Sequence, residues 1–133
     1  MSHLEIYIDG ASKGNPGHSG VGIVIYRDGL RIKNISNYIG SATNNVAEYT
    51  ALIYALEEAL LLKAKSLKIN TDSQLLARQL NKIYKVRHPG IINLYNRAVH
   101  LLTGFEKVLI NNIPRQENSL ADKLATQAIK LAL

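Results

Sequence analysis

The sequence contains no cysteine, so disulfides and thiolate zinc sites are excluded and a reducing cytosol is compatible with the chain. Its four histidines are scattered without the spacing of metal ligands. No apolar run approaches the roughly 20 residues that a membrane span needs, and no amino-terminal run resembles a signal peptide. We therefore expect a soluble, cytoplasmic protein that does not enter a membrane.

Acidic residues are absent from Ser73 to Phe105, although five basic residues lie there and the formal net charge of the chain is +6. Arg78, Lys82 and Lys85 have the spacing that would align them along one stripe of a helix. A helix face that is only solvated would normally mix in Glu or Asp. The charge distribution therefore favours contact with nucleic acid, although net charge alone also serves solubility.

With 133 residues, 47% of them apolar, the chain can bury one real core, and we expect a single domain over residues 1–133. Hydrophobic periodicity and turn signals predict nine elements. They are strands within 4–9, 21–26, 30–38, 66–72 and 108–113, and helices within 44–63, 74–83, 92–102 and 120–131. The first three strands suggest an antiparallel meander with a hairpin at Asp28-Gly29, and the later strand–helix–strand order implies a parallel pair. The expected fold class is α/β.

Four acidic residues fall at predicted strand ends or in predicted first turns of helices: Asp9, Glu48, Asp72 and Asp122. Simple structural roles exist for three of them, because Asp9 could start an Asx turn, Asp72 could cap a helix, and Asp122 could complement a helix dipole. Glu48 shares the apolar face of its helix, and a buried carboxylate is costly unless it is paired or bound to a cation.

These four carboxylates can lie at one edge of the sheet if the strands of Asp9 and Asp72 are parallel neighbours. Converging carboxylates repel one another unless a cation lies among them. Oxygen ligands favour Mg²⁺ or Mn²⁺, and a pair of such ions is the arrangement used for in-line phosphoryl hydrolysis. The pattern therefore predicts metal-dependent hydrolysis of phosphodiesters.

Four motifs carry a family resemblance. They are Ile8-Asp9-Gly10-Ala11-Ser12 with Gly14-Asn15-Pro16-Gly17, Thr43-Asn44-Asn45-Val46-Ala47-Glu48, Thr71-Asp72-Ser73, and Asn118-Ser119-Leu120-Ala121-Asp122-Lys123-Leu124-Ala125. In this order they resemble the type 1 ribonuclease H family, in its compact archaeal-like and reverse-transcriptase-like form. The resemblance implies a ribonuclease H-like fold, a five-stranded mixed sheet flanked by helices. It also implies an endoribonuclease that cuts the RNA strand of RNA/DNA hybrids with two Mg²⁺ or Mn²⁺ ions, leaving 5′-phosphate and 3′-hydroxyl ends. Activity on RNA/RNA duplexes stays open. Separately, we expect a monomer, although the sequence does not fix the oligomeric state.

The resemblance also assigns roles to residues. Asp9 would bridge both ions, Glu48 and Asp72 would hold one ion and help to orient the water, and Asp122 would hold the other. Substrate contacts are implied for Gly10, Asn15, Thr43, Asn44, Asn45, Gln74 and Arg115, with Lys85 and Arg87 as further phosphate contacts. The amides suit the shallow minor groove of an A-form-like hybrid, and Thr43 matches a position that binds a phosphate of the DNA strand. Helix capping is the alternative role of Asn44 and Asn45.

The chain departs from the family pattern in two places. Many bacterial members carry a mobile histidine in the loop before the last helix, but residues 111–118 contain none, and Arg115 is better suited to holding a phosphate than to moving a proton. The segment 82–89 is too short for the basic protruding helix of some relatives.

Two other interpretations stay open: another nuclease on this scaffold, such as a resolvase or transposase core, and a nucleic-acid-binding module that has lost catalysis.

Overall fold

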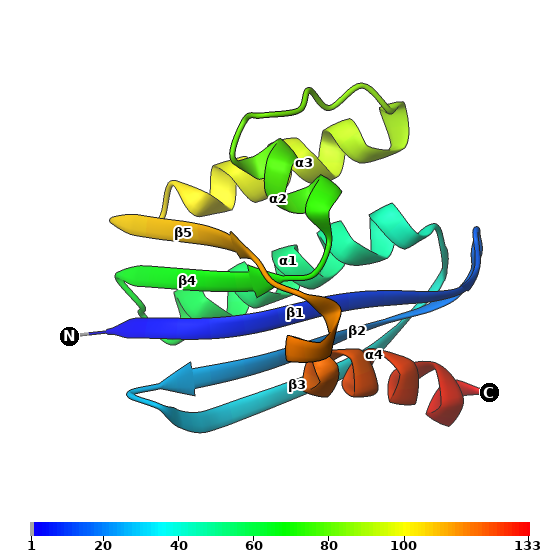
Figure 1. Cartoon of the computed structure of the whole chain (residues 1–133), viewed down its shortest axis with the longest axis horizontal. Coiled ribbons are helices and arrows are strands. Elements are labelled where there is room, and N and C mark those ends of the chain that lie inside the picture. Colours follow the sequence, from blue (N-terminus) through cyan, green and yellow to red (C-terminus); the bar gives the residue numbers. More distant parts are fainter. Residues whose placement is uncertain (1) are drawn as a thin grey trace.

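A five-stranded mixed sheet forms the centre of the computed structural model, which describes residues 2–133 (Figure 1). Its strands are β1 (His3–Gly14), β2 (Gly17–Arg27), β3 (Leu30–Ala42), β4 (Ser66–Thr71) and β5 (Lys107–Asn112). They lie in the order β3-β2-β1-β4-β5, in which β1, β2 and β3 pair antiparallel while β4 runs parallel to both β1 and β5. The predicted α/β fold, a meander joined to parallel strands, is confirmed.

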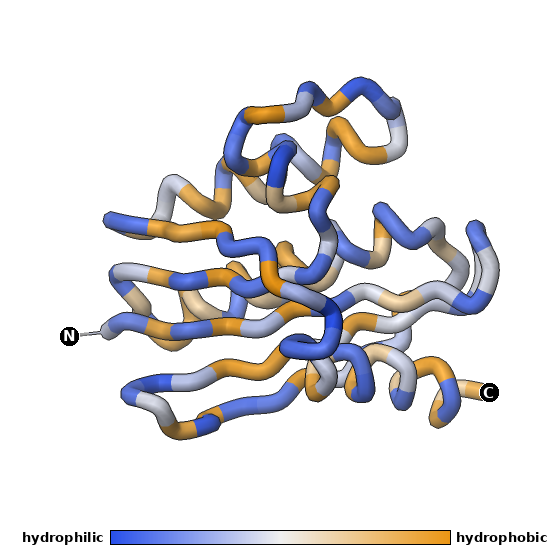
Figure 2. Tube along the Cα trace, viewed as in Figure 1, coloured by the Kyte–Doolittle hydropathy of each residue, from blue (hydrophilic) through white to orange (hydrophobic). Residues whose placement is uncertain are grey.

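Four helices cover the two faces of this sheet: α1 (Asn44–Leu61), α2 (Gln74–Leu80), α3 (Pro89–Leu102) and α4 (Ser119–Ala132). Hydrophobic and hydrophilic residues alternate along β1 and β4 (Figure 2). Leu4, Ile6 and Ile8 of β1 are fully buried on the face that α1 covers. The opposite face of β2 carries α4. Among the described residues, no helix is both long and apolar enough to cross a membrane.

Strand β1 is longer than the sequence predicts, because it continues from Asp9 to Gly14. Residues 10–14, expected to form a loop, instead pair with β2 down to the pair Gly14 and Gly17. Asp9 therefore lies inside a strand, and the prediction that it ends one is wrong. The parallel pairing with β4 nevertheless stops at Ile8, so Asp9 is the first residue of β1 beyond the carboxyl end of β4.

The segment between β4 and β5 differs most from the prediction. Helix α2 ends at Leu80, and Lys82 has a φ of 62°, which a continuing right-handed helix does not allow. Arg78, Lys82 and Lys85 therefore do not form one helical stripe. Helix α3 begins at Pro89, where a break was expected, because the His88 side chain caps it and proline suits a first turn. Of the segment 82–89, expected to be too short for a protruding helix, residues 82–88 form no helix and Pro89 begins α3.

The close packing of α4 on the sheet depends on Gly22 of β2. A Cβ atom at this position would overlap the carbonyl oxygen of Ala121 and lie 2.7 Å from the backbone nitrogen of Ala125. We expect Gly22→Ala to push α4 away from the sheet and to lower the free energy of unfolding by about 1–3 kcal/mol, measured by denaturant unfolding. Asn34→Ala, at an exposed position of β3, is the control, and equal stability of the two variants would contradict this account.

Candidate active site

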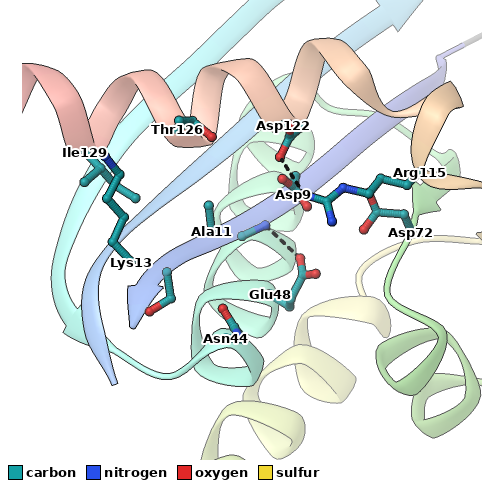
Figure 3. A pocket seen from close by; sticks show the side chains of 12 residues that line it. Asp9, Ala11, Lys13, Asn44, Glu48, Asp72, Arg115, Asp122, Thr126 and Ile129 are labelled. Atoms are coloured by element: carbon teal, nitrogen blue, oxygen red, sulfur yellow. Dashed lines mark hydrogen bonds and ion pairs between the residues drawn. The ribbon is translucent and has the colours of Figure 1, made fainter. Parts of the chain in front are cut away.

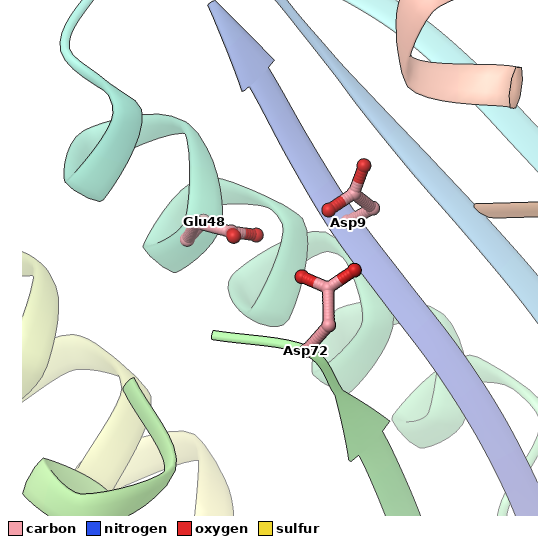
Figure 4. A group of neighbouring side chains, drawn as sticks. All are labelled: Asp9, Glu48 and Asp72. Carbon is pink, nitrogen blue, oxygen red and sulfur yellow. The ribbon is translucent and has the colours of Figure 1, made fainter. Parts of the chain in front are cut away.

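Three carboxylates from distant parts of the chain converge beyond the carboxyl end of β4 (Figure 4). Asp9 comes from β1, Glu48 from α1, and Asp72 directly follows β4. One oxygen of each carboxylate lies within 4.8 Å of one oxygen of each of the others. Asp9 is only 5% exposed, so water solvates its charge poorly. An oxygen cluster of this kind can hold a hard divalent cation.

Glu48 reaches the cluster because α1 approaches β1 very closely. The backbone N–H of Gly10 donates a hydrogen bond to Glu48 Oε1 at 2.7 Å. A Cβ atom on Gly10 would overlap the backbone of Ala47 and Glu48, so the helix can come this near only to a glycine. Glu48 is the fifth residue of α1, and the prediction that it lies in the first turn is wrong.

Helix capping does not explain Asp72, because the neighbouring serine caps α2. Ser73 Oγ accepts a hydrogen bond from the backbone N–H of Leu76 at 3.2 Å, which leaves the Asp72 carboxylate to face the cluster. The capping role considered for Asp72 is therefore wrong.

Capping does not explain the two asparagines at the start of α1 either. Thr43 is the N-cap of this helix and accepts from Val46 N at 3.3 Å, so neither Asn44 nor Asn45 has that role. Both asparagine side chains are exposed. The backbone N–H of Asn44 donates instead to Asn15 Oδ1 at 3.0 Å, which ties the β1–β2 hairpin to the helix.

Asn118 holds the cluster in place through hydrogen bonds of its buried amide, a role that the sequence did not predict. It is 1% exposed, and its Nδ2 donates to the carbonyl oxygen of Ile8 at 2.9 Å and to Asp72 Oδ2 at 3.3 Å. Asn118 is the first residue of the last family motif, but the motif assigned it no role. The burial of its amide was the missing information, and sequence does not provide it.

Loss of this amide should weaken the fold around the cluster. We expect Asn118→Ala to lower the free energy of unfolding by about 1–3 kcal/mol, because the buried carbonyl of Ile8 loses its donor. Asn111→Ala is a matched control, since that amide donates to Asn70 Oδ1 at a less buried site. Thermal unfolding of both variants checks the prediction, and a destabilisation no larger than that of the control would oppose it.

Asp122 and Arg115 lie at the wall of the same pocket, which has a volume of about 380 Å³ (Figure 3). Asp122 projects from the first turn of α4 but does not join the three clustered carboxylates. Arg115, in a short 3₁₀ turn (Arg115–Glu117), places Nη2 4.0 Å from Asp122 Oδ1. The structure thus brings all four predicted acids to one pocket, where Asp122 lies beside Asp9 but outside the group of three carboxylates within 4.8 Å of one another.

Burial dominates the electrostatics of the cluster. It raises the pKa of Asp9 to about 9, with the charges of Glu48 and Asp72 adding to the effect. It raises the pKa of Glu48 to about 8, against the lowering influence of the Gly10 N–H. The pKa of Asp72 is also raised by burial, although the Asn118 hydrogen bond and the Arg115 charge oppose the shift. Carboxylates that resist ionising together need a positive partner, which a divalent cation would provide.

The other predicted substrate residues lie in three places. Gly10 and Asn44 line the pocket, and Gln74 is exposed at the first position of α2. Lys85 and Arg87 are exposed in the irregular segment after α2 and do not line this pocket.

Comparison with known proteins agrees with this architecture. The family model described as reverse transcriptase-like matches residues 7–128. The structure of ribonuclease H1 from the archaeon Halobacterium salinarum is 41% identical, covers 97% of this chain and 98% of its own, and superposes with a TM-score of 0.94. The N-terminal ribonuclease H domain of a Mycobacterium tuberculosis protein is 37% identical, with coverage of 96% and 98% and a TM-score of 0.92.

A third structure, LC11-RNase H1 isolated from compost, was solved in complex with an RNA/DNA hybrid. It is 37% identical, with coverage of 97% of this chain and 98% of its own and a TM-score of 0.91. The chain spans 35% of the length of the curated mycobacterial protein and 64% of the curated haloarchaeal ribonuclease HI. On the extent of these matches, the chain belongs to the reverse transcriptase-like ribonuclease H domains of the type 1 ribonuclease H family.

Proposed function

We propose that the chain is an endoribonuclease that hydrolyses the RNA strand of RNA/DNA hybrids with two divalent cations, Mg²⁺ or Mn²⁺. The observation that carries the proposal is the convergence of Asp9, Glu48 and Asp72 within 4.8 Å in a chain of this family. The hybrid bound by a relative that is 37% identical supports the substrate class.

The residues present fit such cations. All the donors are carboxylate oxygens, the preferred ligands of Mg²⁺ and Mn²⁺, and their raised pKa values indicate that positive charge is needed between them. Asp9 would be shared by both ions, Glu48 and Asp72 would hold one, and Asp122 would hold the other. When bound, the ions supply the Lewis-acid chemistry that activates water and neutralises charge developing on a phosphate.

The chain's own residues hold these ligands in place before substrate arrives. The Gly10 N–H fixes one oxygen of Glu48, and the Asn118 amide fixes one oxygen of Asp72. Such outer hydrogen bonds orient ligating carboxylates and reduce the reorganisation needed during reaction. Arg115 is 82% exposed at the pocket wall, where its guanidinium can bind a phosphate oxygen but cannot shuttle a proton.

Substrate recognition would use the polar groups around the pocket. We assign minor-groove contacts to Asn15, Asn44, Asn45 and Gln74, whose amides can both donate to and accept from 2′-hydroxyls and base edges. Gly10 would contact the RNA strand through its backbone where it lines the pocket, and Thr43 would contact a phosphate of the DNA strand. Lys85 and Arg87 would meet phosphates farther from the cut. That the chain acts as a monomer in the cytoplasm remains a prediction.

A cleavage assay on three end-labelled duplexes tests this function. RNA/DNA, RNA/RNA and DNA/DNA would each be incubated with Mg²⁺, Mn²⁺ or chelator, and the products separated on a gel. We expect internal cuts in the RNA of the hybrid that chelator abolishes; cuts in RNA/RNA would widen the substrate range. Retained hybrid binding without cleavage in either ion would favour the binding module, and cleavage of DNA/DNA would favour another nuclease on this scaffold.

A further inference from the structure

The pocket that holds the carboxylates continues along β1 to a lysine (Figure 3). Because side chains alternate along a strand, Asp9, Ala11 and Lys13 point to the same face of β1. The four-residue separation places the Cα atoms of Asp9 and Lys13 about 13 Å apart at roughly 3.3 Å per residue. This arrangement exists only because β1 continues beyond Asp9, where the sequence suggested a loop.

Lys13 is a free cation at this end of the pocket. It is exposed, and it forms no ion pair with any of the residues that the structure describes. Its side chain extends from β1 toward Ile129 of α4, near Thr126 (Figure 3). A lysine can rest its aliphatic stem on an apolar side chain of this kind while its ammonium group stays in water.

The charges of the pocket are ordered along its length. The carboxylates lie at one end with the Arg115 guanidinium among them, and Lys13 lies at the other end (Figure 3). The carboxylates accept a phosphate only with cations among them, whereas Lys13 attracts one directly. A nucleic-acid strand with one phosphate at the carboxylates and its backbone running along β1 would place a second phosphate at Lys13.

We propose that Lys13 binds a phosphate of the RNA strand, one to three nucleotides to one side of the bond that is cut. The inference rests on the proposed function, because the strand cut at the carboxylates is the RNA strand. The contact is sequence-independent and sets the register of the RNA backbone in the pocket, as phosphate contacts do in nucleic-acid complexes generally.

Steady-state kinetics of Lys13→Met at several salt concentrations give the first test. We expect KM for hybrid to rise about fivefold at low salt while kcat stays within about twofold, because a binding contact is lost without change at the carboxylates. The slope of log(kcat/KM) against log[salt] should become shallower by about 0.7–0.9, the value for one phosphate contact. Lys13→Arg should retain the contact, and Lys107→Met, exposed at the far edge strand β5, should match the wild type.

Hybrids with a single methylphosphonate, which removes the charge of one phosphate, then locate the contact. Their affinity is measured with protein that also carries Asp72→Asn, so that the result does not depend on cleavage. Neutralising one phosphate of the RNA strand, one to three nucleotides from the cut site, should weaken the binding of hybrid by the protein that carries Lys13. The same replacement should cause no further loss of affinity in the protein with Lys13→Met. The proposal would be overturned if the loss of affinity at each methylphosphonate position were the same with and without Lys13. It would also be overturned if Lys13→Met changed the effect of replacements in the DNA strand only. Failure of the wild type to cut any duplex would instead refute the proposed function.

Discussion

Asp72→Asn should reduce the rate of RNA cleavage by at least about 10³-fold while the protein stays folded and binds hybrid. The substitution keeps the shape of the side chain, so Asn118 and the packing around it are little disturbed. It removes one of three carboxylate charges within 4.8 Å, and a metal-stabilised transition state is worth several kcal/mol, of which each 1.36 kcal/mol is about tenfold in rate. Single-turnover cleavage of end-labelled hybrid in Mg²⁺ measures the effect.

Asp28→Asn is the matched control for this experiment, because Asp28 lies in the turn between β2 and β3 and does not line the pocket. It should cleave at the wild-type rate. Cleavage by Asp72→Asn at more than about a tenth of the wild-type rate would show that the carboxylate cluster is not the reacting centre.

Asp9→Asn should stabilise the metal-free protein although it also removes activity. Folding raises the pKa of Asp9 from its ordinary 3.8 to about 9, mainly because the carboxylate is buried and secondarily because Glu48 and Asp72 repel its charge. The amide carries no charge to bury. At pH 8 with chelator we expect a gain in the free energy of unfolding of at least about 1 kcal/mol, or roughly 2–8 °C in Tm.

The sign of the pH dependence follows from the raised pKa. Below pH 4 the Asp9 carboxyl is protonated in both the folded and the unfolded chain, and its contribution to stability is fully present. As the pH rises from about 4 toward 9, the unfolded chain releases the proton and the folded chain keeps it, so the free energy of unfolding falls. Glu48 adds a similar loss up to about pH 8.

Thermal unfolding between pH 4 and pH 9, with chelator and then with Mg²⁺, checks these expectations. The wild type in chelator should lose stability across this range more steeply than Asp9→Asn, and Mg²⁺ should restore the wild type more than the variant. A variant that is less stable than the wild type in chelator at pH 8 would contradict the assigned electrostatics.

The sequence predicted the order of the elements and their pairing well, because local signals determine both. Alternation in Leu4, Ile6 and Ile8 marked β1, and the positive φ angles of Asp28 and Gly29 confirm the predicted hairpin. The extension of β1 to Gly14 was not predictable in this way. It depends on pairing with β2, and glycine, serine and lysine carry little strand propensity of their own.

The sequence predicted the acidic residues of the candidate site but not the groups that hydrogen-bond to them. The motifs name Asp9, Glu48 and Asp72, whereas tertiary packing places the Asn118 amide beneath Asp72 and the Gly10 backbone against Glu48. The prediction of a basic stripe through Arg78 and Lys82 is wrong because the helix is shorter than its hydrophobic spacing indicated. Arg78 lies in α2, but Lys82 lies beyond its end and takes a left-handed conformation.

The most direct test of the central claim is the chemistry of the RNA ends that the wild-type protein leaves in a hybrid with Mg²⁺. Metal-dependent attack of water at the carboxylate cluster predicts internal cuts with 5′-phosphate and 3′-hydroxyl ends, all lost in chelator. Products with 2′,3′-cyclic phosphates, or cuts that persist in chelator, would mean that a 2′-hydroxyl rather than an activated water attacks. Either result would contradict the role proposed for Asp9, Glu48, Asp72 and Asp122.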